Sequence, residues 1–263
     1  MNNRQKLTIA ALACAILFCS GYYMSGNGYL NRIGEQRMLL NIAPPARGSA
    51  EQKKDEFVFL KTRSYKDSAR WKQAIADSKA SVAEIVNGFG CATGRQISAK
   101  NMQNFFKLLS KTNEDAERLA HKSKKEFKIA HPYMLYGGVT CTKPLGYDYP
   151  SGHAIQGWII ARLLVEFYPE RRAEIFSHAR SFAESRVICG VHSVSAVEVD
   201  EDYSAKIIDR LKKIPAFQND LSAAKVEMLT LKMTPMTGQS CRKFPPKYVK
   251  PFSFNSSLLS RGQ

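Results

Sequence analysis

The sequence predicts an all-α fold built as a single helical domain. Apolar residues recur at helical spacing over most of the chain, and segments that alternate apolar with polar residues are few. Of the 263 residues, 44% are hydrophobic and 24% are charged, which is an ordinary composition for a globular protein with a sizeable core. We expect the helical domain over 56–232, after an extended lead-in over 23–55 and before an irregular, Pro-containing basic tail over 233–263.

The first half of the domain predicts two long helical stretches. The stretch 69–86 favours one helix that stops at an Asn-Gly pair, a good C-terminal capping signal. Ser98 is a suitable N-cap for a long helical region whose apolar face continues toward Phe127. The Gly- and Tyr-containing stretch 133–149 is then expected to form a loop.

The second half predicts four further helices. The first covers about 153–168, where apolar residues fall at helical spacing. The next takes Pro169 into its first turn and ends near Ser185. A third covers about 193–213, and the last covers 217–231.

The amino terminus has the build of an export segment. Arg4 and Lys6 precede an apolar stretch and then small residues, which is the pattern of a secretory signal peptide over 1–22. An uncleaved anchor is the alternative, because the apolar run can be extended over 7–24, near the ~20 residues that span a bilayer. The first interpretation predicts a periplasmic or secreted protein, and the second an inner-membrane protein anchored by 7–24.

The chain is strongly basic, with a formal net charge of +16. Without Arg4 and Lys6, 37 basic residues face 23 acidic ones, which leaves +14. A positive field of this size favours anionic partners such as phosphate esters or an anionic membrane surface. The basic residues lie scattered in short runs without a zinc-finger or RNA-binding signature, so we predict no specific nucleic-acid partner.

Two short blocks carry the chemistry that the sequence predicts. The first, Pro-Ser-Gly-His over 150–153, opens an apolar helix and places a hydroxyl, free backbone N–H groups and an imidazole where the helix dipole favours anions. The second contains Arg186, whose guanidinium suits bidentate contact with phosphate oxygens, and His192. Together the two blocks predict a phosphate site.

These blocks resemble the phosphatidic acid phosphatase type 2 superfamily, and their surroundings resemble its bacterial class A non-specific acid phosphatases. The family pattern runs Lys-x6-Arg-Pro, then Pro-Ser-Gly-His, then Ser-Arg-x5-His-x3-Asp. The corresponding residues here are Lys124-x6-His131-Pro132, Pro150-Ser151-Gly152-His153 and Ser185-Arg186-x5-His192-x3-Ala196. The similarity spans about 41–225, and order and spacing hold throughout.

The resemblance implies an exported, metal-independent acid phosphatase that hydrolyses small phosphate monoesters, with no cofactor. His192 would attack phosphorus to form a phosphohistidine, and His153 would protonate the leaving oxygen and then activate water. Inorganic phosphate would bind in the same place. The groups that hold the phosphoryl oxygens would be Lys124, His131, Ser151, Gly152 and Arg186.

Two positions depart from the family pattern. His131 replaces an arginine with an imidazole, whose ordinary pKa is about 6.5, so phosphate binding is expected to depend more on pH. Ala196 replaces the carboxylate that orients the nucleophile. Glu198 is a candidate substitute, although six residues do not match one helical turn from His192. Restoring His131→Arg and Ala196→Asp together is expected to raise turnover.

Two other functions stay open on the sequence. A phosphate-binding protein with impaired catalysis on the same scaffold is one, because both departures fall in the expected site. A membrane-associated lipid-phosphate phosphatase or phosphotransferase is the other, since the basic surface would suit an anionic bilayer. A homo-oligomer is compatible with the sequence in each case.

Four cysteines lie beyond the export segment, an even number that suits an exported protein and allows three pairings. We favour Cys141–Cys189, because Cys141 lies ten residues before Ser151 and Cys189 three before His192, so this bridge would join the two catalytic segments. Its complement is Cys91–Cys241. Reduced, buried cysteines are the alternative.

Overall fold

The computed structural model describes residues 28–30, 42–231 and 234–236. The regular secondary structure of these residues is helical, with one isolated β-bridge between Arg95 and Pro235, so the all-α prediction is confirmed. The expected export segment over 1–22 and nearly all of the tail over 233–263 lie outside the described residues. Within the described ranges, no helix combines the length and the apolar character that crossing a membrane requires.

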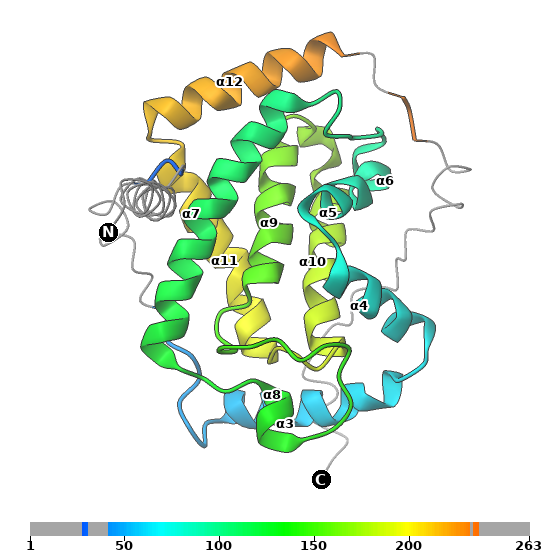
Figure 1. Cartoon of the computed structure of the whole chain (residues 1–263), viewed down its shortest axis with the longest axis vertical. Coiled ribbons are helices and arrows are strands. Elements are labelled where there is room, and N and C mark those ends of the chain that lie inside the picture. Colours follow the sequence, from blue (N-terminus) through cyan, green and yellow to red (C-terminus); the bar gives the residue numbers. More distant parts are fainter. Residues whose placement is uncertain (1–27, 31–41, 232–233, 237–263) are drawn as a thin grey trace, which may run out of the picture.

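Four long helices lie along the long axis of the molecule (Figure 1). They are α7 (Gln103–Phe127), α9 (Gly152–Val165), α10 (Arg172–Ile188) and α11 (Val194–Leu211). A further helix, α12 (Pro215–Thr230), crosses one end of this bundle. The opposite end carries α3 (Ala50–Thr62) and the short α8 (Pro132–Tyr136).

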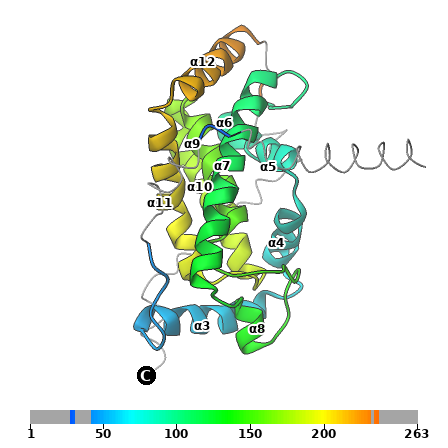
Figure 2. The same ribbon diagram turned by 60° about the vertical axis from the view of Figure 1, so that its left-hand side comes forward.

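Shorter elements cover the side of the bundle formed by α10 (Figure 2). They are η1 (Arg63–Tyr65), α4 (Ala69–Lys79), α5 (Val82–Gly88), α6 (Gly90–Thr93) and the single turn η2 (Pro169–Arg171) that leads into α10. Pro169 therefore opens a 3-10 turn directly ahead of the helix in which it was expected.

The central helix is α9, which packs against α7, α10 and α11. Its residues are apolar on nearly every face, because a helix enclosed by neighbours has no solvent-facing side. Gly157 lets α10 approach closely, since a Cβ atom there would lie 2.6 Å from Cδ1 of Phe182. Ile155, Ile159 and Ile160 of α9 are among the largest fully buried side chains of the described residues.

The expected loop over 133–149 begins inside helix α8, and three helix boundaries elsewhere also differ from the expected ones. The predicted helix over 69–86 is two helices, because Ser81 and Glu84 form a capping box that begins α5. Helix α7 begins at Gln103 and is not capped by Ser98, whose hydroxyl bonds Asn101 instead. The amides at its start donate to the carboxylate of Glu227 from α12, at 3.0 Å each.

The third difference lies in the segment expected to be an extended lead-in. Helix α3 begins at Ala50, inside 23–55, because the Ser49 side chain caps it by accepting from the Gln52 amide at 3.2 Å. This early helix matters for the site, since α3 contacts α8, α10 and α11 at the end of the bundle.

The ends of four helices meet at the same end of the bundle, beside α3 and α8. These are the carboxyl ends of α7 and α10 and the amino ends of α9 and α11. The predicted disulfide Cys141–Cys189 is confirmed, and it fixes the segment before α9 to the end of α10. The Cys141 amide also donates to the Cys189 carbonyl, at 3.0 Å. The second predicted bridge stays a prediction, because Cys241 lies outside the described residues.

Candidate active site

The residues of the two sequence blocks come together at this end of the bundle, in the interior of the protein. Ser151 is fully buried, His131 is 1% exposed, and Arg186 and His192 are each 5% exposed. Lys124 adds a half-buried ammonium group from the last turn of α7. Buried polar groups of this kind need hydrogen-bond partners, which makes their contacts informative.

Arg186 offers buried donors without a protein acceptor. Its Nε and Nη1 have no hydrogen-bond partner among the described residues. Burial lowers the pKa of the guanidinium to about 10, while Asp77 acts in the opposite direction, so Arg186 remains charged at neutral and acidic pH. An arginine presents its N–H groups in a planar fork that matches the oxygens of a phosphoryl group.

The start of α9 adds further donors next to open space. The Ser151 hydroxyl makes no capping bond and has no partner in the described part of the chain. The Ser151 amide donates to the Ala196 carbonyl of α11 at 3.1 Å, which holds the two helix starts together. A Cβ atom built on Gly152 would meet no atom of the described residues within 4 Å, which leaves room for an anion close to this helix N-terminus.

His192 is paired with a carboxylate. Its Nδ1 lies 2.8 Å from Oδ1 of Asp148, a residue of the segment between α8 and α9. Burial lowers the pKa of His192 well below its ordinary value, and Lys124, Arg186 and His131 act in the same direction. The ring is therefore neutral. When its Nδ1–H donates a hydrogen bond to Asp148, the lone pair of the ring lies on Nε2.

His131 lies beside this pair. Its Nδ1 lies 2.7 Å from the Val191 carbonyl, and the same atom is 3.9 Å from Oδ1 of Asp148. Burial lowers the pKa of His131, although the Val191 contact opposes the shift. The bond to Val191 therefore fixes the ring through Nδ1 and does not involve Nε2. Because its pKa is lowered, the ring becomes a cation less readily than an ordinary histidine.

His153 points toward α4, where its Nε2 lies 2.8 Å from the Asp77 carbonyl. Burial lowers the pKa of His153 to about 4, and the charge of Arg186 contributes to the shift. A phosphate dianion close by would raise that pKa, because an opposite charge favours the protonated ring.

Lys124 holds the segment that carries Asp148. Its Nζ donates to the carbonyls of Tyr147 and of Asp148, the latter at 3.2 Å. Burial lowers the pKa of Lys124, and the Asp148 carboxylate opposes this shift. Lys124, one of several lysines near the end of α7, thus turns toward the site.

The expected substitute carboxylate, Glu198, is engaged elsewhere. Its Oε1 accepts from Nζ of Lys54 on α3 at 3.0 Å, and its side chain is 52% exposed. The carboxylate at Nδ1 of His192 belongs instead to Asp148, which sequence reasoning missed. A signal was present, because Asp148 lies two residues before the Pro-Ser-Gly-His block.

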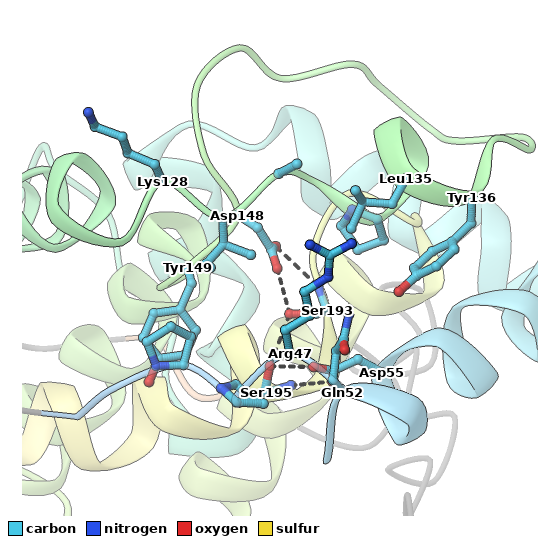
Figure 3. A pocket seen from close by; sticks show the side chains of 15 residues that line it. Arg47, Gln52, Asp55, Lys128, Leu135, Tyr136, Asp148, Tyr149, Ser193 and Ser195 are labelled. Atoms are coloured by element: carbon cyan, nitrogen blue, oxygen red, sulfur yellow. Dashed lines mark hydrogen bonds between the residues drawn. The ribbon is translucent and has the colours of Figure 1, made fainter. Parts of the chain in front are cut away.

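Asp148 belongs to a hydrogen-bonded chain that continues to α3 (Figure 3). The Ser193 hydroxyl donates to Oδ2 of Asp148 at 2.5 Å and lies 3.2 Å from the Ser195 hydroxyl. Ser195 donates to Asp55 through its hydroxyl at 2.6 Å and its amide at 2.8 Å. Burial raises the pKa of Asp55 and that of Asp148 to about 6 each.

A cavity of about 620 Å³ adjoins this chain. Figure 3 shows its labelled side chains, which come from the segment before α3, from α3 itself, from the end of α7, from α8, from the segment between α8 and α9, and from the start of α11. Arg47 and Lys128 contribute positive charge, and Tyr136 and Tyr149 contribute ring surface. Since Asp148 and Ser193 line it, the cavity lies directly beside the carboxylate that contacts His192.

Three side chains of the site also have the composition of a metal centre. His131, Asp148 and His192 each offer a ligand atom, and these atoms lie within 4.8 Å of one another. The spacing of these residues in the sequence did not indicate such a cluster. Both rings, however, engage Nδ1 in hydrogen bonds, His131 with Val191 and His192 with Asp148.

The bundle gathers buried histidines at one end, together with an arginine whose Nε and Nη1 have no partner among the described residues. This set of groups fits the class of hydrolases that act on phosphate esters. Comparison with known proteins narrows the class. The chain is 34% identical over 196 residues to a non-specific acid phosphatase from Providencia stuartii, covering 72% of this chain and 79% of that protein. It therefore belongs to the bacterial non-specific acid phosphatases and is a phosphoric monoester hydrolase.

Two further relatives agree. A non-specific acid phosphatase from Salmonella typhimurium is 32% identical over 192 residues, covering 70% of this chain and 77% of its own length. An acid phosphatase from Zymomonas mobilis is 28% identical over 197 residues, covering 72% and 75% respectively. No family model matches the chain.

Proposed function

We propose that this acid phosphatase hydrolyses small phosphate monoesters through a phosphohistidine formed on Nε2 of His192. The contact between His192 and Asp148 carries the proposal: Nδ1 of the buried imidazole is engaged by the carboxylate. Two further features support it. Burial lowers the pKa of His192 well below its ordinary value, and buried N–H groups of Arg186 have no other acceptor among the described residues. A neutral ring fixed at Nδ1 is the state in which Nε2 acts as a nucleophile.

In the first step the lone pair on Nε2 of His192 forms the N–P bond as the P–O bond to the leaving group breaks. His153 donates its proton to the leaving oxygen, after the substrate dianion has raised its pKa from about 4. In the second step His153, now neutral, accepts a proton from water. That water attacks phosphorus, and the N–P bond breaks to release phosphate and the free imidazole.

The phosphoryl oxygens are held by fixed donors. Nε and Nη1 of Arg186 each offer N–H groups that have no other acceptor among the described residues, and the Ser151 hydroxyl and the Gly152 amide add donors at the start of α9. Lys124 adds a cation from α7. His131 donates from Nε2 once the bound phosphate has raised its pKa, which makes binding tighter in acid.

The scheme assigns every chemical step to side chains of this chain and calls for no metal ion or other cofactor. The impaired-catalysis interpretation rested on two departures, His131 and Ala196. For the second of them, the carboxylate of Asp148 lies at Nδ1 of His192 and offers a replacement. We further propose that the protein is exported to the periplasm or secreted, on the signal-like residues 1–22.

The test is hydrolysis of p-nitrophenyl phosphate from about pH 4 to 8, together with trapping of the phosphoenzyme by rapid quench. His192→Ala is expected to lower kcat by at least ~10³-fold and to abolish the acid-labile, base-stable phosphoenzyme. The matched control is His121→Ala, an exposed histidine on α7, which should leave both readouts unchanged. A His192→Ala enzyme that turns over at the normal rate contradicts the proposal, as does a rate that EDTA abolishes.

A further inference from the structure

We propose that Asp148 is the positioning residue for the nucleophile, doing from the α8–α9 segment what the family pattern assigns to an aspartate at position 196. The inference rests on the proposed function, since it gives Asp148 a role only if Nε2 of His192 attacks phosphorus. It nevertheless goes beyond that function, because it identifies how this chain works without the carboxylate that its relatives' pattern requires.

The contact between the two side chains is short, buried and directional. Nδ1 of His192 lies 2.8 Å from Oδ1 of Asp148, and Asp148 and His192 are 1% and 5% exposed. A buried carboxylate at this distance fixes the imidazole tautomer. It accepts a hydrogen bond from Nδ1–H, so the proton stays on Nδ1 and the lone pair on Nε2. It also stabilises the positive charge that the ring acquires when Nε2 bonds to phosphorus.

Asp148 is itself held on both oxygens. The Ser193 amide donates to Oδ1 at 3.1 Å, and the Ser193 hydroxyl donates to Oδ2 at 2.5 Å. Ser193 in turn lies next to Ser195, whose amide and hydroxyl are bound by Asp55 of α3. These contacts join Asp148 to two helices, so a carboxylate from a loop acquires the rigidity that a helical position would provide.

The backbone of the loop is fixed as well. Nζ of Lys124 donates to the carbonyl of Asp148 at 3.2 Å, and the Asp148 amide donates to the Ile129 carbonyl at 2.8 Å. The orientation of the carboxylate is therefore set from its backbone and from both oxygens. Such preorganisation is what a positioning group requires, because it avoids rearrangement during the reaction.

The surroundings of position 196 agree with a carboxylate supplied by Asp148 in place of one at position 196. Ala196 is fully buried in the first turn of α11, its amide accepted by the Ser193 hydroxyl at 3.2 Å and its carbonyl bound by the Ser151 amide. An aspartate here would add a second buried negative charge beside the Asp148–Ser193 pair. Since like charges in one site repel, the two carboxylates are alternatives. The expectation that His131→Arg and Ala196→Asp together raise turnover is therefore revised in its second substitution for a chain that retains Asp148.

The experiment exchanges the carboxylate between the two positions. Asp148→Asn is expected to lower kcat by about 10²- to 10⁴-fold with KM nearly unchanged, because the amide no longer accepts the Nδ1 proton as a carboxylate does. Adding Ala196→Asp to Asp148→Asn should recover at least tenfold of that loss. Ala196→Asp alone should lower kcat, and the exposed control Asp209→Asn on α11 should leave it unchanged.

A role limited to folding would not produce recovery by a carboxylate at the second position. A further readout needs no variant, namely the ¹⁵N spectrum of His192 in the unmodified protein, which should report a neutral ring with its proton on Nδ1. A proton found on Nε2 overturns the proposal. So does an Asp148→Asn enzyme with near-normal kcat while His192→Ala is inactive, a result that leaves the phosphohistidine mechanism intact. If His192→Ala itself stays active, the proposed function fails first.

Discussion

His192 and Asp148 form a buried pair in which burial acts on the two side chains in opposite directions. Burial lowers the pKa of His192 well below its ordinary value and raises that of Asp148 to about 6. The imidazole therefore stays neutral in acid, whereas the carboxylate is lost as the pH falls through about 6. The acid limb of the kcat profile is accordingly expected to follow Asp148. Its pKa of about 6 is the net result of burial, which raises it, and of the Ser193 hydrogen bonds and the charges of His131 and Lys124, which lower it.

Ser193→Ala tests this assignment. The hydroxyl of Ser193 lowers the pKa of Asp148 by donating to the ionised carboxylate, so its removal should raise that pKa. The protonated carboxyl then persists to higher pH, and the acid limb of kcat on p-nitrophenyl phosphate should move upward. Asp55 and Asp200 also face Asp148 electrostatically, and both are retained in the variant.

A suitable control removes a helix cap elsewhere. Ser193 is the N-cap of α11, so its loss also costs about 0.5–2 kcal/mol of stability. Ser81→Ala removes the exposed N-cap of α5 at a similar cost, and it should leave the acid limb in place. An acid limb that stays fixed or moves downward in Ser193→Ala would show that a group other than Asp148 sets it.

Among the elements, α9 and α10 approach each other at Gly157. A Cβ atom there would lie 2.6 Å from Cδ1 of Phe182, whose ring packs 5.1 Å from that of His153. Overpacking of this kind costs about 1–3 kcal/mol. Part of that cost is offset by the better helix propensity of alanine, about 1 kcal/mol.

Gly157→Ala is therefore expected to be less stable to urea than Gly152→Ala, by about 1–3 kcal/mol. Gly152 is the matched control because it lies in the same helix, gains the same residue, and has nothing within 4 Å of the added atom. Displacement of Phe182 should also disturb His153 and lower kcat. Equal unfolding free energies for the two variants would show that α10 moves to accept the methyl group.

Element boundaries show what local sequence can and cannot specify. The apolar periodicity of α9 and α11 predicted these helices, because burial of their faces follows from the residues themselves. The start of α7 was missed, since its amides are capped by Glu227, more than a hundred residues later. Ser81 was missed because its capping box lies inside a continuous helical pattern.

In the site, too, features set by local sequence could be predicted and those set by long-range contacts were missed. Ser151, Gly152 and Arg186 could be predicted because each belongs to a contiguous block with a recognisable pattern. Asp148 was missed although it lies two residues before the Pro-Ser-Gly-His block, since its contact with His192 joins residues 44 apart and depends on how a loop folds over the end of the bundle. Glu198 was favoured by sequence proximity alone, and its direction on α11 takes it to Lys54 instead.

The whole molecule carries a formal charge of +16, which should act on substrate capture. Long-range attraction of a phosphate dianion is screened over about 10 Å at 0.1 M ionic strength, whereas contacts inside a buried site are screened much less. We expect kcat/KM for p-nitrophenyl phosphate to fall steadily between 10 and 500 mM salt while kcat changes little. Repeating the series with chloride and gluconate separates screening from binding of chloride, and a kcat/KM independent of both salts would exclude steering.

The origin of Asp148 also affects how degenerate members of an enzyme family are recognised. Under the predicted match to the family pattern, inspection of position 196 alone would class this chain as an inactive relative, because it has alanine where that pattern has aspartate. In space, however, a carboxylate lies at Nδ1 of His192. Whether a homologue keeps its catalytic activity therefore depends on whether a carboxylate lies beside the imidazole of the nucleophile. In this fold that carboxylate can come either from the segment before α9 or from the first turn of α11.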